Sequence, residues 1–218
     1  MFDTVLFDLD GTLTDSAPGI WAGFRHALAS VGAPEPTEDF LSRVIGPPLL
    51  DSFRSIGLDE AATAAAHAAY IQRYDERGWA ENTVYDGIDD VLSGLTARGV
   101  TLAVATSKNE KFAQRILDHF ELARHFEFVA GASDDGTRRA KADVIARALT
   151  EIGRSPASAA GGVVMVGDRE HDVAGAAHWG IPTVTVGWGY GAPNEHAAAR
   201  WHVSSTTELE EVLRGITV

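Results

Sequence analysis

The feature that most constrains this chain is a pair of aspartates near its start. Asp8 and Asp10 come directly after the apolar run of residues 5–7, and Gly11 follows them. The apolar run predicts a short buried strand over residues 2–7. Two carboxylates one residue apart at the end of a buried strand repel each other and are costly to bury. Such a pair makes chemical sense around a cation or a proton transfer.

Three further polar motifs stand beside apolar runs in the same way. In an open parallel sheet, ligands bind at the carboxyl ends of the strands. We therefore expect the residues just past the apolar runs to converge with the first motif. They are Thr106 and Ser107 after residues 100–105, Lys141 at the start of a helical run, and Asp168 and Asp172 after residues 163–166.

The second half of the chain alternates between strand-like and helix-like segments. Repeated strand–helix units of this length predict an α/β fold with a Rossmann-like, doubly wound parallel sheet. Strands are expected at residues 100–105, 126–130, 163–166 and 182–186, the last being the final strand. Helices are expected at residues 88–95, 112–120, 141–152 and 173–179.

The first third of the chain has a different, helical pattern. Apolar residues recur at helical spacing from residue 20 to residue 31, and an alanine-rich stretch at residues 59–74 has strong helix propensity. Further helices are expected from Pro34 to residue 41 and over residues 49–56. We interpret residues 15–81 as a helical unit inserted into a core made of residues 1–14 and 82–218.

Composition is typical of a globular enzyme that does not bind polyanions. The chain has 218 residues, with 31 acidic and 18 basic side chains and a net charge of −13. This balance disfavours nucleic acid and anionic membranes as partners. It contains no cysteine, so disulfides, thiolate metal sites and a cysteine nucleophile are excluded. With no secretory leader pattern or membrane-length apolar run, a cytoplasmic location is expected. The oligomeric state is not predicted.

Taken in order, these motifs resemble those of the haloacid dehalogenase (HAD) superfamily of hydrolases. The resemblance covers the whole chain, including a helical cap between the first and second motifs, as in the subgroup similar to phosphoglycolate phosphatases and 5'-nucleotidases. It implies a Rossmann-like core, bound Mg²⁺ and catalysis through an aspartyl-phosphate. The expected substrate is a small phosphorylated metabolite.

The chemistry of the motif residues agrees with phosphoryl transfer. Asp8 is the candidate nucleophile, because carboxylates form acyl-phosphates. Asp10 is the candidate acid and base for the leaving oxygen and for water. The Thr106 hydroxyl, with Ser107 beside it, is expected to bind a phosphoryl oxygen, and the Lys141 ammonium to balance the phosphate and Asp8.

A magnesium ion is the expected cofactor. Mg²⁺ prefers hard oxygen ligands and keeps several waters. The Asp8 and Asp168 side chains and the Asp10 carbonyl are the expected ligands, with Asp172 as a ligand or as a group that orients water. Gly11 is expected to let the backbone approach the phosphoryl group closely.

Several assignments stay open at this point. Arg43 and the turn at residues 45–49 are the best candidates for substrate contact in the helical unit, although a surface arginine beside a turn is an equally good interpretation. The aromatics Trp188 and Tyr190 lie in a glycine-rich segment that we interpret as packing. A phosphatase and a phosphotransferase acting on a sugar or protein hydroxyl both fit the motifs. A non-catalytic binding protein is disfavoured because every candidate catalytic residue is present.

Overall fold

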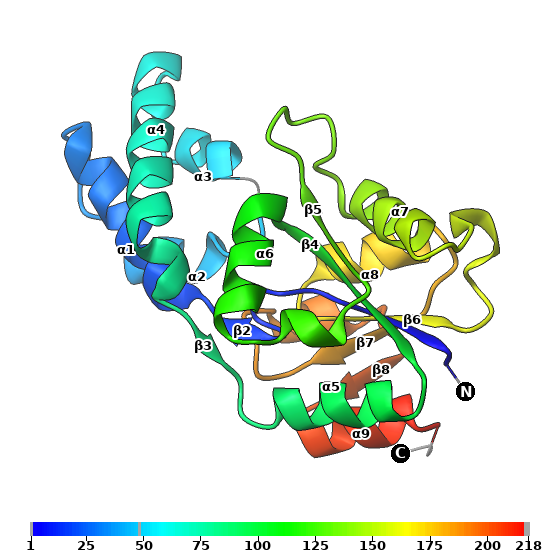
Figure 1. Ribbon diagram of the computed structural model, residues 1–218. Helices are drawn as coiled ribbons and strands as arrows, with labels where there is room; N and C mark the ends of the chain where they lie inside the picture. The colour runs from blue at the N-terminus through cyan, green and yellow to red at the C-terminus, as the bar shows by residue number, and fades with distance from the viewer. Residues whose placement is uncertain (1, 48, 216–218) are drawn as a thin grey trace. The chain divides into compact units, whose positions relative to one another are not determined.

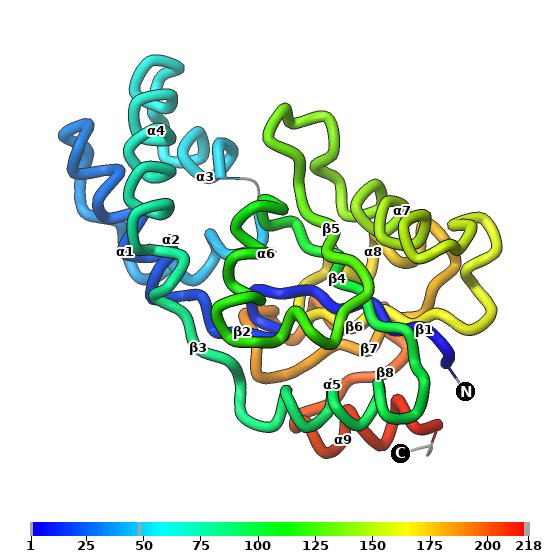
Figure 2. Tube along the Cα trace, in the orientation of Figure 1, coloured from blue at the N-terminus to red at the C-terminus, as the bar shows by residue number. Residues whose placement is uncertain are grey.

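The computed structural model describes residues 2–47 and 49–215. The chain divides into two compact units, which we call the core unit (Met1–Thr14 and Val84–Val218) and the helical unit (Asp15–Thr83). Figure 2 traces the chain out of the core unit after its first strand and back into it before a long α/β region. Pro48, part of the predicted turn, lies outside the described residues.

The core unit is built on a parallel sheet, which confirms the predicted α/β fold class (Figure 1). In the part of the chain that the structure describes, this sheet has six strands in the order β5-β4-β1-β6-β7-β8. Neighbouring strands pair in parallel throughout. The strands are β1 (Thr4–Phe7), β4 (Thr101–Asn109), β5 (Phe128–Ala132), β6 (Val163–Gly167), β7 (Thr183–Val186) and β8 (Trp201–Val203).

The strand order creates a crevice beside β1. The chain goes from β1 to β4 and β5 on one side, then crosses to β6 on the other side of β1. Ligands bind at such switch points, outside the carboxyl ends of the strands. Phe7 is in register with Val166 of β6 and Val104 of β4. The residues that follow these three therefore emerge at the same level of the sheet.

Helices pack on the sheet through the alternate side chains of its strands. Leu6, Ala103 and Met165 share a buried cluster with Ile145, whereas their sequence neighbours point to the opposite face. Helix α7 contacts α8, β4 and β5, while α5 contacts β4 and α9. The core helices are α5 (Ile88–Ala97), α6 (Glu110–His119), α7 (Lys141–Glu151), α8 (Glu170–Ala177) and α9 (Thr206–Leu213), with short 3₁₀ turns at Ala123–His125, Pro156–Ser158 and Pro193–His196.

Two features of the core unit differ from the sequence prediction. Strand β4 continues to Asn109 instead of ending at residue 105, through a register shift against β5. The strand at residues 182–186 is not the last one, because β8 and α9 follow it. Strand β8 has three residues, of which only Val203 is buried. A single buried position gives no periodic pattern to read.

The helical unit has its own aromatic core. Its helices are α1 (Ala17–Ser30), α2 (Glu38–Arg43), α3 (Leu49–Ser55) and α4 (Glu60–Glu76), with a 3₁₀ turn at Gly78–Ala80. The rings of Phe24, Phe53 and Tyr70 pack against one another. Helix α2 begins later than the predicted Pro34, because the Thr37 side chain caps it by accepting the Phe40 N–H. The two connections to the core unit pair as β2 (Thr14–Asp15) and β3 (Thr83–Val84).

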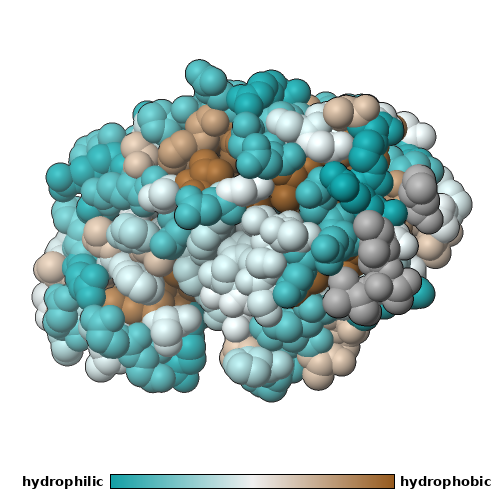
Figure 3. Space-filling model, turned by 90° about the horizontal axis from the view of Figure 1, so that it is seen from below, coloured by the Kyte–Doolittle hydropathy of each residue, from teal (hydrophilic) through white to brown (hydrophobic). Residues whose placement is uncertain are grey.

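The described surface is mostly polar. Figure 3 shows hydrophilic and intermediate residues over most of the face in view, with hydrophobic residues in smaller areas between them. Among the described residues, the large hydrophobic side chains that are exposed are Ile56 and Ile71. Within the same residues, no helix has both the length and the apolar character needed to cross a membrane.

Candidate active site

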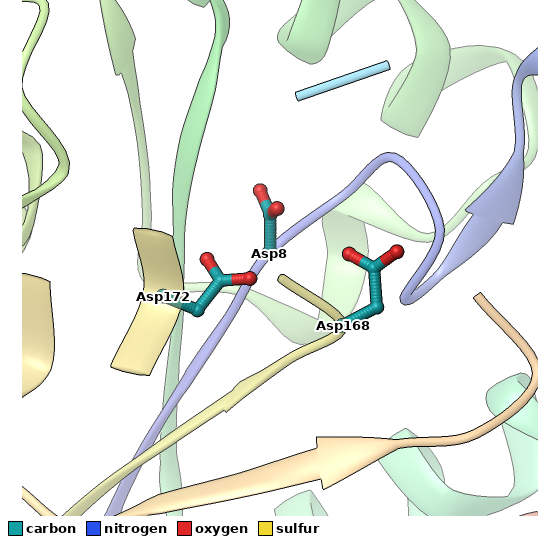
Figure 4. A group of neighbouring side chains, drawn as sticks. All are labelled: Asp8, Asp168 and Asp172. Atoms are coloured by element: carbon teal, nitrogen blue, oxygen red, sulfur yellow. The ribbon is translucent and has the colours of Figure 1, made fainter. Parts of the chain in front are cut away.

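Three buried aspartates meet at the switch point of the sheet. Asp8 follows β1, Asp168 follows β6, and Asp172 lies in the first turn of α8. Each offers a carboxylate oxygen, and these oxygens lie within 4.8 Å of one another. Figure 4 shows the three side chains gathered at the ends of their elements. The structure therefore brings together three of the four predicted metal-binding aspartates by their side chains.

Lys141 neutralises part of this acidic cluster. It is the first residue of α7, where the helix dipole disfavours a cation. Another interaction must therefore stabilise its charge at this position. Its Nζ lies 2.9 Å from Asp8 Oδ1 and 2.7 Å from Asp172 Oδ1. It also donates a 2.9 Å hydrogen bond to the Ala105 carbonyl. Lys141 is buried, and its role is tied to the aspartates rather than to solvent.

Burial and neighbouring charges shift the pKa values of Asp168, Asp172 and Lys141. Burial, together with the neighbouring carboxylates, raises the pKa of Asp168 well above its usual range. Burial also raises the pKa of Asp172 to about 6, even though Lys141 acts in the opposite direction. Burial opposes the charged form of Lys141, but the Asp172 and Asp8 carboxylates outweigh it and raise the pKa of this ammonium. Three carboxylates against one ammonium leave the cluster short of positive charge.

The donor set fits a hard cation. Asp168 Oδ1 is buried and has no hydrogen-bond partner among the described residues. By contrast, both oxygens of Asp172 are engaged, by Lys141 and by the Arg169 backbone N–H at 3.1 Å. A buried carboxylate oxygen without a partner is costly. Oxygen-only donors with excess negative charge are what Mg²⁺ takes in proteins, so Asp168 is the strongest metal-ligand candidate and Asp172 is held mainly by protein groups.

The glycine-rich segment at residues 187–191 holds Asp168 in place. The Tyr190 backbone N–H donates a 2.7 Å hydrogen bond to Asp168 Oδ2. A Cβ on Gly189 would lie 2.4 Å from both Asp168 Cβ and the Gly11 carbonyl oxygen, and one on Gly11 would lie 2.3 Å from Asp168 Oδ2. Gly11 also has a φ of +79°, which other residues rarely adopt. Gly11 and Gly189 therefore allow the backbone to pack directly against the Asp168 side chain, where a larger residue would not fit.

Trp188 joins this segment to the first motif. Its Nε1 donates a 3.2 Å hydrogen bond to the Thr12 carbonyl, and its ring contacts Tyr85. The interpretation of the aromatic segment as packing therefore agrees with these contacts. The same contacts place the packing against the first motif and Asp168, which the sequence did not reveal.

Asp10 has a partner that the sequence analysis missed. Lys108 Nζ lies 3.0 Å from Asp10 Oδ1 and 3.0 Å from Asp10 Oδ2. This pairing left no clear signal in the sequence, because strand β4 is irregular between Ala105 and Asn109, where its register against β5 shifts. It was overlooked because the strand was expected to end at residue 105.

Thr106 is buried at the same strand end, and its hydroxyl accepts the Lys108 backbone N–H at 3.2 Å. It does not cap the next helix, whose N-cap is Asn109. Among the described residues, no hydrogen bond or ion pair links Ser107 to the acidic cluster. Arg43 lies in the helical unit, is 71% exposed and pairs with Asp39.

Comparison with known proteins agrees with this geometry. The model of the family described as haloacid dehalogenase-like hydrolase matches residues 5–186, which include all four motifs. The chain belongs to this family. The resemblance seen in the motifs is confirmed, and so is the expected enzyme class, a HAD-superfamily hydrolase of the phosphoric monoester type.

Relatives of this HAD hydrolase carry several activities in their names. Tyrosine-protein kinase PtkA of Mycobacterium tuberculosis is 50% identical over 96% of this chain and 72% of its own length. A 5'-nucleotidase of Pseudomonas aeruginosa is 43% identical over 89% and 86% of the two chains. Phosphoglycolate phosphatase 1 of the same organism is 31% identical over 94% of this chain and 77% of its own length. The crystal structure of a predicted phosphatase from Clostridium acetobutylicum matches with a TM-score of 0.90 and 38% sequence identity, and the match covers 99% of both chains.

The packing around Asp168 leads to a first prediction for this HAD hydrolase. Gly189→Ala introduces a Cβ where no space exists, so Asp168 must shift. We expect about 1–3 kcal/mol lower stability in urea denaturation and at least about tenfold weaker Mg²⁺ binding by calorimetry. Gly161→Ala is the matched control, because a Cβ there meets nothing within 4 Å. Wild-type Mg²⁺ affinity in Gly189→Ala would contradict the role of this segment.

The raised carboxylate pKa values give a second prediction. A folded-state pKa of about 6 for Asp172, above its unfolded value, means that the metal-free fold binds protons more tightly than the unfolded chain. This contribution to stability is present below about pH 4 and is lost as the pH rises through about 6. Mg²⁺ competes with those protons. We therefore expect saturating Mg²⁺ to raise the Tm more at pH 7.5 than at pH 5.5, at matched ionic strength. An equal or larger rise at pH 5.5 would contradict this account.

Proposed function

We propose that the chain is a Mg²⁺-dependent phosphatase that hydrolyses a small phosphomonoester through an aspartyl-phosphate on Asp8. The expected substrates are similar to phosphoglycolate or to nucleoside monophosphates. One observation carries the proposal. The Asp8 carboxylate stands at the sheet's switch point beside Lys141, at 2.9 Å, and two further buried aspartates. The names of the 5'-nucleotidase and phosphoglycolate phosphatase relatives support the substrate class.

In the first step, an Asp8 carboxylate oxygen attacks the phosphorus of the ester. The bond to the ester oxygen breaks, and its electron pair stays on the leaving oxygen, which takes a proton from Asp10. Phosphoryl transfer depends on alignment and on neutralising the phosphate oxygens. Lys141 supplies a positive charge to Asp8 and to the phosphate, and the Thr106 hydroxyl donates to a phosphoryl oxygen.

In the second step, water replaces the leaving alcohol. Asp10, now a carboxylate, takes a proton from water while the water oxygen attacks the phosphorus. The bond to Asp8 breaks, and inorganic phosphate and the free carboxylate are regenerated. One group can serve as acid and then as base, because the proton that it gives in the first step is recovered in the second.

Mg²⁺, when bound, would neutralise phosphoryl oxygens and orient the phosphate against the nucleophile. Asp8 and Asp168 would hold it by their side chains and Asp10 by its carbonyl. Asp172 acts on this set mainly through Lys141, which it contacts at 2.7 Å. Closure of residues 15–81 as a cap, and substrate contact by Arg43 or by the turn at residues 45–49, remain predictions.

A phosphotransferase is the second candidate function. One observation favours it, the 50% identity to a protein named as a tyrosine kinase. The chemistry of Asp8 and Asp10 serves both functions, because a hydroxyl can replace water as the acceptor. Release of inorganic phosphate and phosphorylation of a tyrosine peptide, measured in the same assay with the same donor, separate the two functions.

The two aspartates of the first motif give the third prediction. Asp8→Asn should lower turnover by about 10³-fold or more and abolish covalent phosphate labelling, because an amide does not form the acyl-phosphate. Asp10→Asn should slow esters with poor leaving groups by about 10²–10⁴-fold. The rate of p-nitrophenyl phosphate hydrolysis should fall much less, since its leaving group departs without a proton. Phosphate-labelled Asp10→Asn enzyme should accumulate, because the second step also needs Asp10.

Quenched-flow labelling and mapping of the phosphorylated residue check these outcomes. Asp135→Asn is the matched control, because Asp135 is an exposed aspartate of the core unit that is hydrogen-bonded to Ser133 and Thr137. Covalent phosphate on a residue other than Asp8, or full turnover in Asp8→Asn, would overturn the assignment.

A further inference from the structure

Arg169 and Glu195 form a shielded ion pair that the proposed mechanism does not use. Arg169 follows Asp168 directly, and Glu195 lies in the 3₁₀ turn Pro193–His196, just after the glycine-rich segment at residues 187–191. The Arg169 and Glu195 side chains are 12% and 11% exposed, and Arg169 Nε donates to Glu195 Oε2 at 2.8 Å. Breaking a largely buried pair leaves a charge without compensation. The pair therefore holds its two segments together.

The Glu195 carboxylate also accepts two backbone N–H groups from these two segments. Its Oε2 accepts the Glu170 N–H at 3.1 Å, at the first residue of α8. Its Oε1 accepts the Ala192 N–H at 3.1 Å, at the end of the glycine-rich segment. A carboxylate at a helix N-terminus is further favoured by the helix dipole. One side chain thus ties the glycine-rich segment to the start of α8.

These contacts close a ring around Asp168. On one side, the Tyr190 N–H donates to Asp168 Oδ2 at 2.7 Å. The next residue, Gly191, packs so closely that a Cβ on it would lie 1.9 Å from the Asp168 carbonyl oxygen. On the other side, Glu195 leads back to Arg169, which is bonded to Asp168 in the chain. The ring therefore touches both the backbone and the side chain of Asp168.

The glycine-rich segment needs such an anchor. Gly187, Gly189 and Gly191 alternate in it, and glycine loses more conformational freedom on ordering than any other residue. Without an anchor the segment would populate other conformations, and the Tyr190 N–H would leave the Asp168 carboxylate. A metal-ligating carboxylate that is held by a hydrogen bond binds its metal more tightly than one that is not. The anchor thus bears on metal affinity.

We infer that Glu195 is a positioning residue for the metal site, which holds the glycine-rich segment against α8 so that the Tyr190 N–H orients the Asp168 carboxylate for Mg²⁺. Glu195 acts through Arg169 and through backbone groups. The inference rests on the Mg²⁺ site of the proposed function. The competing explanation is that Glu195 only caps its own 3₁₀ turn through the Ala192 N–H. In that case its loss would lower stability and leave Mg²⁺ affinity unchanged.

The first test measures Mg²⁺ affinity by calorimetry. Glu195→Gln keeps the size of the side chain and removes its charge, and should weaken Mg²⁺ binding by about 10- to 100-fold. Arg169→Met should weaken it to a similar extent, whereas Arg169→Lys keeps the charge and should keep most of the affinity. The double variant Glu195→Gln/Arg169→Met should bind Mg²⁺ no more weakly than either single variant, because all three break the same pair.

Glu110→Gln is the matched control for the loss of an ion pair. Glu110 Oε2 accepts from the Arg138 guanidinium at 2.8 Å and from the Gly131 backbone N–H at 3.1 Å. It therefore combines a guanidinium and a backbone donor, as Glu195 does. Urea denaturation should show lower stability in Glu110→Gln, with the Mg²⁺ affinity of wild type. Unchanged Mg²⁺ affinity in folded Glu195→Gln, or an equal loss in Glu110→Gln, would overturn the positioning role.

Hydrogen exchange provides a readout without metal. The Tyr190 amide should exchange slowly in wild type and in Glu110→Gln, because it is bonded to the buried Asp168 carboxylate. In Glu195→Gln it should exchange at least about tenfold faster, because the anchor of its segment is lost. A role confined to the 3₁₀ turn would leave the Tyr190 amide at its wild-type rate. If Glu195→Gln does not fold, Arg169→Met and Arg169→Lys carry the same comparison from the other end of the pair.

The outcomes separate this inference from the proposed function. If wild type binds Mg²⁺ and releases phosphate, but Glu195→Gln binds Mg²⁺ equally well, the positioning role is overturned and the phosphatase assignment stands. If wild type binds no Mg²⁺, the metal-dependent assignment fails. In that case faster exchange of the Tyr190 amide in Glu195→Gln still supports the positioning of Asp168 by Glu195, and exchange at the wild-type rate overturns it.

Discussion

The site depends on a shortage of positive charge. Asp8, Asp168 and Asp172 are all buried, and Lys141 is the cation that contacts two of them, at 2.9 and 2.7 Å. Burial and neighbouring like charges both disfavour a charged carboxylate, and they raise the pKa values of Asp168 and Asp172. An added cation would relieve this conflict, so we expect metal binding to be coupled to the stability of this core.

The fold creates this conflict through its topology. Crossing from β5 back to β6 places the ends of β1 and β6 side by side. The glycine-rich segment after β7 then fixes Asp168 through the Tyr190 backbone N–H and through contacts too close for any larger residue at position 189. The backbone thus brings the aspartates together, and these contacts hold the Asp168 side chain in place.

Much of the site could be predicted from sequence because its residues stand at strand ends. Asp8 and Asp168 come just after short apolar runs, at residues 5–7 and 163–166, and in a parallel sheet such positions converge. Lys108 was missed because strand β4 continues through polar residues, where hydrophobic pattern carries no signal. Lys108 lies on that extension, so its pairing with Asp10 could be predicted only by knowing which residues of the extension face the site. The three-residue strand Trp201–Val203 was missed because it has one buried position.

The most direct test of the account is Mg²⁺ binding by the full chain and by Asp168→Asn, measured by calorimetry together with urea denaturation. Because Asp168 Oδ1 is a buried oxygen without a hydrogen-bond partner, and Lys141 pairs with Asp8 and Asp172 instead, the account predicts saturable binding by wild type. It predicts at least about 100-fold weaker binding by Asp168→Asn. The variant should also remain folded, with metal-free stability equal to or above that of wild type, since a buried repulsion is removed. Unchanged Mg²⁺ affinity in the folded variant would contradict the account.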